Sequence, residues 1–189
     1  YAASSGGYDG IRMATVGSDG MLYGAGFTGG DEAGTIFVVY AGAGNVVKVH
    51  PADGAQIWSQ DIADSEYVLA VAEVDETLYC ATAEWDTDLG MTALTTRGSP
   101  LAQAPLAGTA DIIPYDLATD GAHLYYGGHR GRPGAGDPFD FSCIKVDLTG
   151  QLQWVEHYAN PRGYSLSHIR NELYGVKADE TGVYLFGGT

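Results

Sequence analysis

Gly17-Ser-Asp-Gly-Met-Leu-Tyr23 is a turn signal that runs into a short apolar strand centred on a tyrosine, and the chain contains this pattern four times. The other copies are Val74-Asp-Glu-Thr-Leu-Tyr79, Thr119-Asp-Gly-Ala-His-Leu-Tyr125 and Asp179-Glu-Thr-Gly-Val-Tyr184. Successive tyrosines are 56, 46 and 59 residues apart, near the length of a four-stranded propeller blade and beyond a helical-hairpin repeat. The sequence therefore predicts a tandem β-repeat.

A predicted hairpin lies in each interval between two of these tyrosines. An alternating strand enters a turn whose glycine can take the left-handed conformation, and a second strand leaves it through a large apolar residue. The three hairpins span 46–58, 91–101 and 144–154, with turn glycines Gly54, Gly98 and Gly150 and outgoing residues Trp58, Leu101 and Trp154. Trp58 and Trp154 are expected to pack between neighbouring repeats.

A further strand precedes each tyrosine strand by about ten residues, which completes four strands per repeat. These strands are predicted at 11–16, 67–72, 112–117 and 172–177. The 28 glycines and 13 tyrosines suit short strands joined by tight turns. We expect an all-β structure with negligible α-helix.

With this strand pattern, the chain resembles β-propellers of the quinoprotein-like and bacterial seven-bladed-repeat (SBBP-type) kind. Their blades have a similar order of strand, Asp-x-x-Gly-x-x-x-Trp, strand and Asp-x-x-Gly-x-x-Tyr-x-x-Gly. The resemblance covers the whole chain; it is strongest at 144–189 and 8–58 and weaker at 84–108, where Leu101 replaces tryptophan. It implies a β-propeller of four-stranded blades. Families with such blades include enzymes, assembly scaffolds and cell-surface binders.

The repeats extend over residues 1–189, with approximate units at 8–64, 65–110, 111–170 and an incomplete unit at 171–189. About three and a half blades are thus expected. This favours a fragment of a larger propeller, because six to eight blades of about 50 residues need a longer chain. The alternative is a closed four-bladed ring, in which residues 1–10 would complete the last blade.

The charge balance excludes one class of partner. Nine basic against 24 acidic residues give a formal charge of -15, which repels a polyanion, so nucleic acid is not expected as a partner. The bases are unevenly placed, because residues 1–128 hold three of them and residues 129–189 hold six. The last third of the chain is therefore the part that can attract an anion.

The compartment is inferred from composition. No stretch approaches the ~20 apolar residues of a membrane helix. Cys80 and Cys143 are the two cysteines of the chain, so their pairing stays open and a disulfide-dense miniprotein is excluded. Low lysine content, acidity and tandem β-repeats favour an extracellular or periplasmic protein.

Cofactor chemistry receives weak support from the sequence. Enzymes of the resembled kind that use pyrroloquinoline quinone carry an adjacent cysteine pair, whereas Cys80 and Cys143 are 63 residues apart. No cofactor is therefore predicted. Calcium is a possible ligand at Asp86 and Asp88, which lie two apart before Gly90, although a solvated acidic loop explains them too.

A cationic surface is the candidate binding site. It draws on two long connections and comprises His129, Arg130, Arg132, Arg162, His168 and Arg170. Guanidinium groups on one face would suit carboxylate or sulfate groups. The alternative is ion pairing with nearby acids, namely Asp137, Asp140, Glu156 and Glu172.

The sequence thus predicts a secreted β-propeller that serves as a rigid structural or binding module in a larger extracellular chain or assembly. Its expected partner is a protein, a carbohydrate or further copies of the chain. The alternative function is a quinoprotein-type enzyme whose active site lies on blades outside this chain. No catalytic residue is predicted, because the chain has no nucleophile elbow, phosphate loop or zinc-binding motif.

Overall fold

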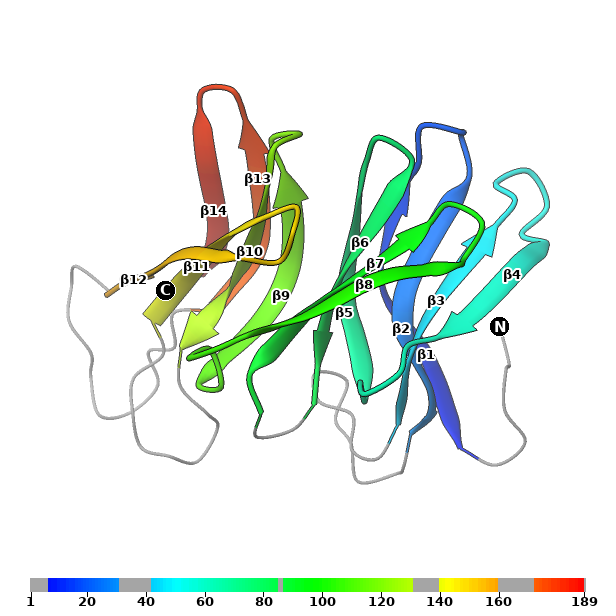
Figure 1. The fold of residues 1–189 in the computed structure, drawn as a ribbon, viewed down its shortest axis with the longest axis horizontal. Helices are drawn as coiled ribbons and strands as arrows, with labels where there is room; N and C mark the ends of the chain where they lie inside the picture. The colour runs from blue at the N-terminus through cyan, green and yellow to red at the C-terminus, as the bar shows by residue number, and fades with distance from the viewer. Residues whose placement is uncertain (1–6, 31–41, 85–86, 131–139, 160–171, 189) are drawn as a thin grey trace. The chain divides into compact units, whose positions relative to one another are not determined.

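The computed structural model describes residues 7–30, 42–84, 87–130, 140–159 and 172–188 (Figure 1). Within these ranges the regular elements are fourteen β-strands, so the predicted all-β class is confirmed. They form three four-stranded antiparallel sheets and one two-stranded sheet. No helix in this part of the chain has the length and apolarity needed to cross a membrane.

The chain divides into two compact units, residues 1–104 and 105–189. Unit 1 contains two sheets in which sequence neighbours are hydrogen-bonded neighbours. Blade 1 consists of β1 (Tyr8–Val16), β2 (Leu22–Gly30), β3 (Ala43–Val49) and β4 (Gln56–Asp61). Blade 2 consists of β5 (Tyr67–Val74), β6 (Thr77–Ala83), β7 (Leu89–Thr95) and β8 (Pro100–Leu106), whose last residues cross into unit 2.

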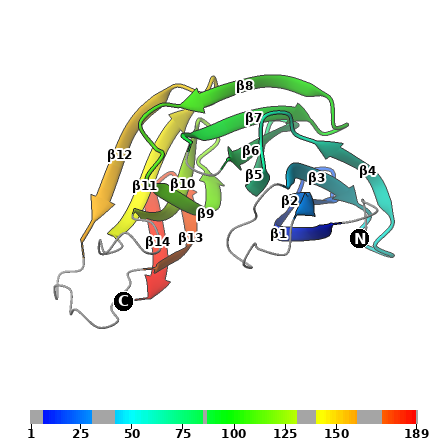
Figure 2. The same ribbon diagram turned by 90° about the horizontal axis from the view of Figure 1, so that it is seen from below.

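Unit 2 contains one complete sheet and one pair of strands. Blade 3 consists of β9 (Ile112–Thr119), β10 (His123–Arg130), β11 (Asp140–Asp147) and β12 (Leu152–Tyr158), again in sequence order across the sheet. The pair is β13 (Glu172–Asp179) and β14 (Gly182–Gly188). Figure 2 shows this hairpin beside β9 and β10. All four predicted tyrosine strands are therefore present, as β2, β6, β10 and β14.

The hairpins that join the third and fourth strands of each blade have the glycine turns that the sequence predicts. Gly54, Gly98 and Gly150 have φ angles of 71°, 86° and 88°, in the left-handed region that glycine tolerates. The flanking strands pair antiparallel, with Lys48 opposite Trp58 and Lys145 opposite Trp154. The predicted hairpins are thus confirmed, and each lysine lies beside a tryptophan on the neighbouring strand.

The core of unit 1 lies between its two blades. Blade 1 contributes Tyr23, Ala25 and Val46, and blade 2 contributes a second set of buried side chains: Val68, Val71, Leu78, Cys80 and Leu94. Because small and β-branched side chains alternate with the tyrosine ring, the two sheets approach closely over this face. Met21 and Trp58 cover the edge of the cluster.

The core of unit 2 has the same construction. Tyr125 and Cys143 of blade 3 pack against Val176 of β13. Val183 and Leu185 of β14 and Trp154 of blade 3 are partly buried against this cluster. Each unit is therefore stabilised by apolar burial between consecutive sheets rather than within one sheet.

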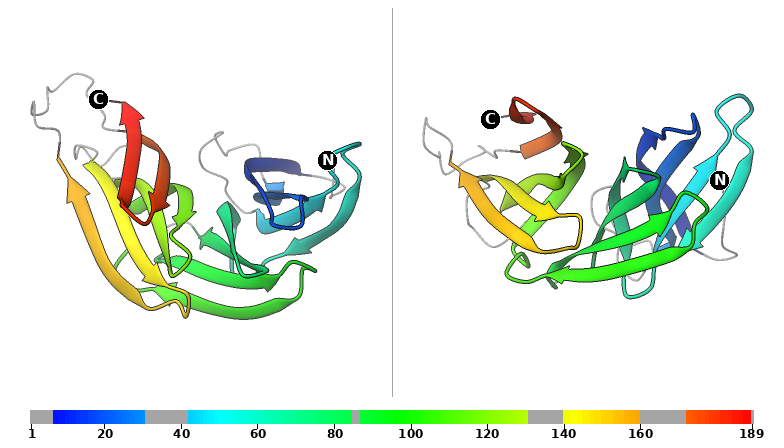
Figure 3. Two further views of the ribbon diagram at one scale, coloured as in Figure 1. Left: turned by 90° about the horizontal axis from the view of Figure 1, so that it is seen from above. Right: turned by 45° about the horizontal axis from the view of Figure 1, so that its top comes forward.

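The first strand of every sheet contains a β-bulge at an equivalent position. The bulge residues are Arg12, Leu69, Tyr115 and Tyr174, at each of which the register of the first strand with the second shifts by one residue. Figure 3 shows β9 and β13, which carry two of these bulges, neighbouring each other. A bulge bends the strand and redirects one side chain. The residue at this position of the repeat therefore differs from one sheet to the next.

Gly26 is required by the close approach of β1 at the Arg12 bulge. A Cβ atom at Gly26 would lie 1.8 Å from the carbonyl oxygen of Gly10. Gly128 is in the same situation in blade 3, where a Cβ atom would lie 2.3 Å from the carbonyl oxygen of Ile113. The bulged strand thus leaves no room for a side chain on the strand beside it.

We predict that Gly26→Ala lowers the free energy of unfolding by about 1–3 kcal/mol or more, because backbone must move to admit the methyl group. Gly182→Ala is the matched control, since nothing lies within 4 Å of its Cβ position, and it should be neutral or slightly stabilising. Urea denaturation of both variants measures the difference. Equal midpoints would refute the close approach.

Candidate functional site

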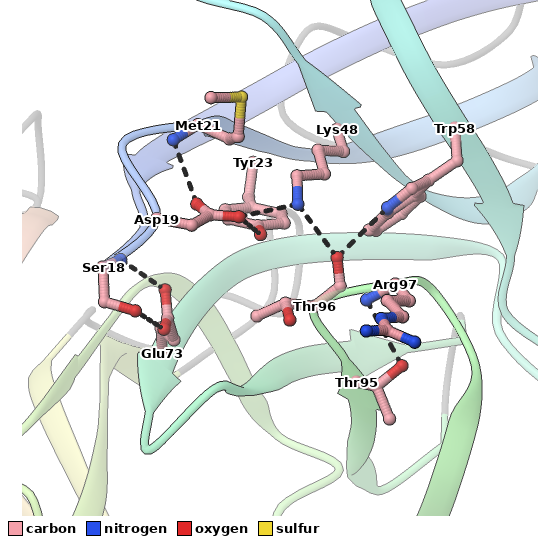
Figure 4. Close-up of polar contacts among 10 residues, drawn as sticks. All are labelled: Ser18, Asp19, Met21, Tyr23, Lys48, Trp58, Glu73, Thr95, Thr96 and Arg97. Carbon is pink, nitrogen blue, oxygen red and sulfur yellow. Dashed lines mark hydrogen bonds and ion pairs between the residues drawn. The ribbon is translucent and has the colours of Figure 1, made fainter.

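The most developed polar cluster in unit 1 surrounds Tyr23 (Figure 4). Asp19, in the turn between β1 and β2, accepts hydrogen bonds through Oδ2 from Lys48 Nζ at 2.6 Å and from the Tyr23 hydroxyl at 2.8 Å. The backbone N–H of Met21 donates to its other oxygen at 3.0 Å. Lys48 lies over the Tyr23 ring, with Nζ 5.1 Å from the ring centroid. The side chain of Lys48 is 13% exposed, so its charge requires these partners.

The same cluster joins blade 1 to blade 2. The carbonyl oxygen of Thr96, in the turn between β7 and β8, accepts from Lys48 Nζ and from Trp58 Nε1, each at 3.2 Å. A Cβ atom at Gly98 in this turn would lie 3.1 Å from the Trp58 ring, so the glycine lets the turn rest on the indole. The tryptophan therefore makes the contact between repeats that the sequence predicts.

A second contact between the blades lies at the same strand ends, beside Asp19. The hydroxyl and backbone N–H of Ser18, in the β1–β2 turn, both donate to the carboxylate of Glu73 on β5 (Figure 4). Tyr23 lies 6.1 Å from Trp58, ring centroid to ring centroid. Charged and aromatic groups together thus fix blade 1 on blade 2.

Unit 2 repeats the arrangement with nearly the same geometry. The Tyr125 hydroxyl donates to Asp120 Oδ2 at 2.8 Å, and Lys145 Nζ lies 5.6 Å from the Tyr125 ring centroid. Tyr125 and Trp154 are 6.2 Å apart with an interplanar angle of 48°, the angle also found for Tyr23 and Trp58. The set of Asp, Tyr, Lys and Trp is therefore a repeated structural element.

The aspartate of each cluster has a lowered pKa, for the same physical reasons. Burial opposes ionisation of Asp19, but hydrogen bonds from Lys48, Met21 and Tyr23 lower the pKa of its carboxyl to about 2. Asp120 shows the same balance, and its pKa is also well below the usual range. Burial, together with the hydrogen bond to Asp120, raises the pKa of Tyr125 to about 12. Carboxylate and neutral phenol are therefore the stable forms.

We predict that Trp154→Ala and Trp58→Ala each lower the free energy of unfolding by about 3–5 kcal/mol, because each removes a large aromatic from a contact between sheets. Ile57→Ala is the control, since Ile57 is 50% exposed on β4. Denaturant midpoints give the comparison. A wild-type midpoint for Trp154→Ala would mean that this indole is a surface residue available for stacking a ligand.

Asp19 makes stability depend on pH. Its folded pKa is depressed from 3.8 to about 2, so its contacts stabilise the fold above pH 3.8 and are lost as the pH falls through about 2. We predict that Asp19→Asn is less stable than wild type at neutral pH and loses less stability between these values. Denaturation at a series of pH values measures this. Asp53→Asn, whose carboxyl is 68% exposed, should follow the wild-type curve.

Two of the six predicted cationic residues lie in the described part of the chain. His129 is buried on β10, with its ring 4.9 Å from the ring of Tyr115. Arg130 is exposed, and its Nε donates to Asp111 Oδ2 at 2.8 Å. This acid is not among the ion-pair partners named from the sequence. Arg132, Arg162, His168 and Arg170 lie outside the described residues, so the shared cationic surface stays a prediction.

An aromatic surface in unit 2 escaped the sequence analysis. It consists of Tyr115 and Tyr174, and the buried ring of His129 packs against Tyr115. The two tyrosines are the bulge residues of β9 and β13, and their rings meet edge to face at 6.2 Å and 83°. Tyr174 is 53% exposed. The neighbouring sequence gives no signal for the pair, because it arises when two bulges come side by side.

Asp116 holds the two bulged strands together beneath this aromatic surface. Its carboxylate is buried and accepts from the backbone N–H of Leu117 at 2.8 Å and of Val176, on β13, at 2.9 Å. A hydrogen bond that a buried carboxylate accepts from a backbone N–H of the next sheet is strong and directional. Tyr115 and Tyr174 are therefore displayed from strands with a fixed register.

The candidate calcium ligands are only partly described. Asp86 lies outside the described residues, and Asp88 precedes β7, where the Thr87 hydroxyl donates to its carbonyl oxygen at 3.2 Å. In the described ranges no group of three or more His, Cys, Asp or Glu side chains could hold a metal ion. Calcium binding at Asp86 and Asp88 stays a prediction.

Both cysteines are buried free thiols. Burial raises the pKa of Cys80 and of Cys143 to about 12, so each thiol stays protonated at neutral pH. Cys80 belongs to the core of unit 1 and Cys143 to that of unit 2. Both cysteines therefore act as small apolar core residues.

Comparison with known proteins gives similarity in structure. No family model matches the sequence, and no curated protein sequence matches it. A solved glucose dehydrogenase is similar over 100% of this chain and 81% of that chain, with a TM-score of 0.43 and 14% identity. BamB from Moraxella catarrhalis is similar over 96% and 71%, with a TM-score of 0.34 and 11% identity. Both are quinoprotein-like β-propellers, the kind that the sequence resembles, and neither assigns an activity to this chain.

Proposed function

We propose that the chain is part of a secreted β-propeller that acts as a rigid binding or structural module in a larger extracellular or periplasmic assembly. The observation that carries the proposal is the aromatic surface of Tyr115 and Tyr174, which is supported by the buried ring of His129. Tyrosine is enriched in binding surfaces because it offers a large apolar ring, a polar end and few rotamers. Here the rings extend from strands rather than loops, which fixes their positions before binding.

The proposal of a rigid module is supported by the contacts that the ionisable side chains of the repeat make. Lys48, Asp19 and Tyr23 have the functional groups of acid–base chemistry, but all three are engaged with one another and with Thr96 of the next sheet. Unit 2 uses Asp120 and Tyr125 in the same way. These groups stabilise the contact between sheets, which supports a scaffold role.

Binding is supported by comparison of equivalent positions. The bulge of β5 carries Leu69, which is 1% exposed and serves the core of unit 1. The bulge of β13 carries Tyr174 instead, at 53% exposure. An apolar residue suffices for folding at this position, so the exposed tyrosine, which meets Tyr115 edge to face, supports a binding role.

The extracellular or periplasmic location rests on composition. Nine basic against 24 acidic residues keep the chain soluble by charge repulsion, and lysine is scarce. Fractionation of the producing cells tests this location, and it is combined with the crosslinking that identifies the partner.

We predict that a benzophenone amino acid placed at Tyr174 forms a discrete crosslinked adduct on irradiation of the organism that makes the protein. The adduct should be found outside the cytoplasm, because the exposed ring of Tyr174 would contact the partner there. Mass spectrometry of the adduct identifies the partner. A carbohydrate partner would be seen as a shift that glycosidase treatment removes.

Tyr158 is the matched control position, since it is 49% exposed on β12 of the same unit. The same adduct from both positions would indicate random collision and contradict the proposal. So would the absence of any adduct from Tyr174, or adducts confined to the cytoplasm. Turnover of an alcohol or sugar by the purified chain with added quinone would favour an enzyme instead.

A further inference from the structure

Tyr115 and Tyr174 are two tyrosine rings in contact across neighbouring sheets. Tyr115 is on β9 of blade 3, and Tyr174 is on β13 of the next pair of strands, in the same unit. The rings meet edge to face with their centroids 6.2 Å apart, within the range of an aromatic contact. Such a pair has a chemistry that neither ring has alone, because two oxidised phenols in contact can join through a carbon–carbon bond.

We propose that Tyr115 and Tyr174 are a modification site, at which a peroxidase outside the cytoplasm joins the two rings as dityrosine. The pairing of the rings rests on the structure alone. The class of oxidant rests on the extracellular or periplasmic location in the proposed function. The product is a covalent link between blade 3 and the β13–β14 hairpin.

The oxidant of this reaction is hydrogen peroxide. Each phenol loses one electron and one proton and becomes a phenoxyl radical. The two radicals pair their electrons in a bond between the ring carbons next to the hydroxyls, and the hydrogens on these carbons then return to the oxygens. In all, the protein loses two electrons and two protons, which reduce one molecule of hydrogen peroxide to two of water. Both hydroxyls are retained, so the link fixes the aromatic surface rather than removing it.

The backbone around both rings is fixed before the reaction. Asp116 follows Tyr115, and its carboxylate accepts from the backbone N–H of Val176 at 2.9 Å. Leu173 and Val176, on either side of Tyr174, are each 0% exposed. Coupling therefore requires rotation of the two side chains alone, since the strands that carry them are already in register.

The two rings differ in their freedom to rotate. Tyr115 is half-buried, and the buried ring of His129 lies 4.9 Å from its ring, centroid to centroid. Tyr174 is 53% exposed, so it is the ring that can turn. One ring is thus held in place while the other rotates toward it, and the fold does not have to open for the two to join.

Contact rather than exposure distinguishes this pair from other tyrosines. Tyr158 is 49% exposed, but its ring contacts no other aromatic ring of the described residues. Tyr23 and Tyr125 have tryptophans as their aromatic neighbours on the next strands but one, and their hydroxyls donate to aspartates. An oxidised ring at any of these positions has no second phenol in ring contact within the part of the chain that the structure describes.

The link closes a loop of the chain between consecutive sheets. Tyr115 and Tyr174 are 59 residues apart in the sequence. A cross-link stabilises a protein mainly by restricting its unfolded chain, and the effect grows with the length of the closed loop. Dityrosine at this site would therefore make the contact between blade 3 and the β13–β14 hairpin more resistant to unfolding.

The first test is mass spectrometry of a tryptic digest of the protein isolated from the producing organism. Trypsin cuts after arginine and lysine, so Tyr115 lies in peptide 98–130 and Tyr174 in peptide 171–177. We expect the two peptides joined, at the sum of their masses less two hydrogen atoms. Fragmentation assigns the link, because peptide 98–130 also contains Tyr125 and Tyr126. Finding the two peptides in unlinked form alone would overturn the proposal.

The second test treats the purified 189-residue chain at low concentration with a haem peroxidase and hydrogen peroxide. Wild type should give a monomeric product with dityrosine fluorescence and a higher urea midpoint than the unreacted chain. Tyr115→Phe and Tyr174→Phe should each abolish the fluorescence of the monomer, since phenylalanine forms no phenoxyl radical. Each replacement removes one hydroxyl group, and urea midpoints measured before oxidation verify that the variants fold.

Tyr158→Phe is the matched control, and it should give the wild-type yield of the monomeric product. Fluorescence confined to covalent dimers would overturn the proposal, and so would a monomeric product that persists in Tyr174→Phe. An unchanged urea midpoint of the linked chain would contradict a link between sheets. A partner adduct at Tyr174 is a separate result, because oxidation of the purified chain needs no partner.

Discussion

A charged lysine held between two sheets is the constraint on which the repeat depends. Lys48 is only 13% exposed, and Asp19, the Tyr23 ring and the Thr96 carbonyl together stabilise its charge. Blade 2 lacks this cation, since Ala93 is opposite Tyr79 and Leu101 replaces the tryptophan. The two blades that have the lysine also have the aspartate, tyrosine and tryptophan, because a buried cation without these partners would be costly, whereas blade 2 lacks the lysine and the tryptophan and keeps Tyr79.

The strands that join neighbouring sheets are therefore different from the strand whose bulge residue varies between repeats. In blades 1 and 3 the second, third and fourth strands carry the tyrosine, lysine and tryptophan that join the sheets. The first strand carries a bulge, where Arg12, Leu69, Tyr115 and Tyr174 replace one another without change in the pairing on either side. Variation at the bulge can therefore create a binding surface while the contacts that stabilise the fold remain intact.

The strands and outer turns could be predicted because their signals are local. Gly98 is left-handed and Tyr125 is on a strand for reasons contained in a few neighbouring residues. The aromatic surface could not be predicted, because Tyr115 meets Tyr174 only after two bulged strands come together. Arg130 likewise contacts Asp111, although Asp140 is its cross-strand neighbour. Which of two nearby acids an exposed arginine selects depends on geometry that the sequence does not contain.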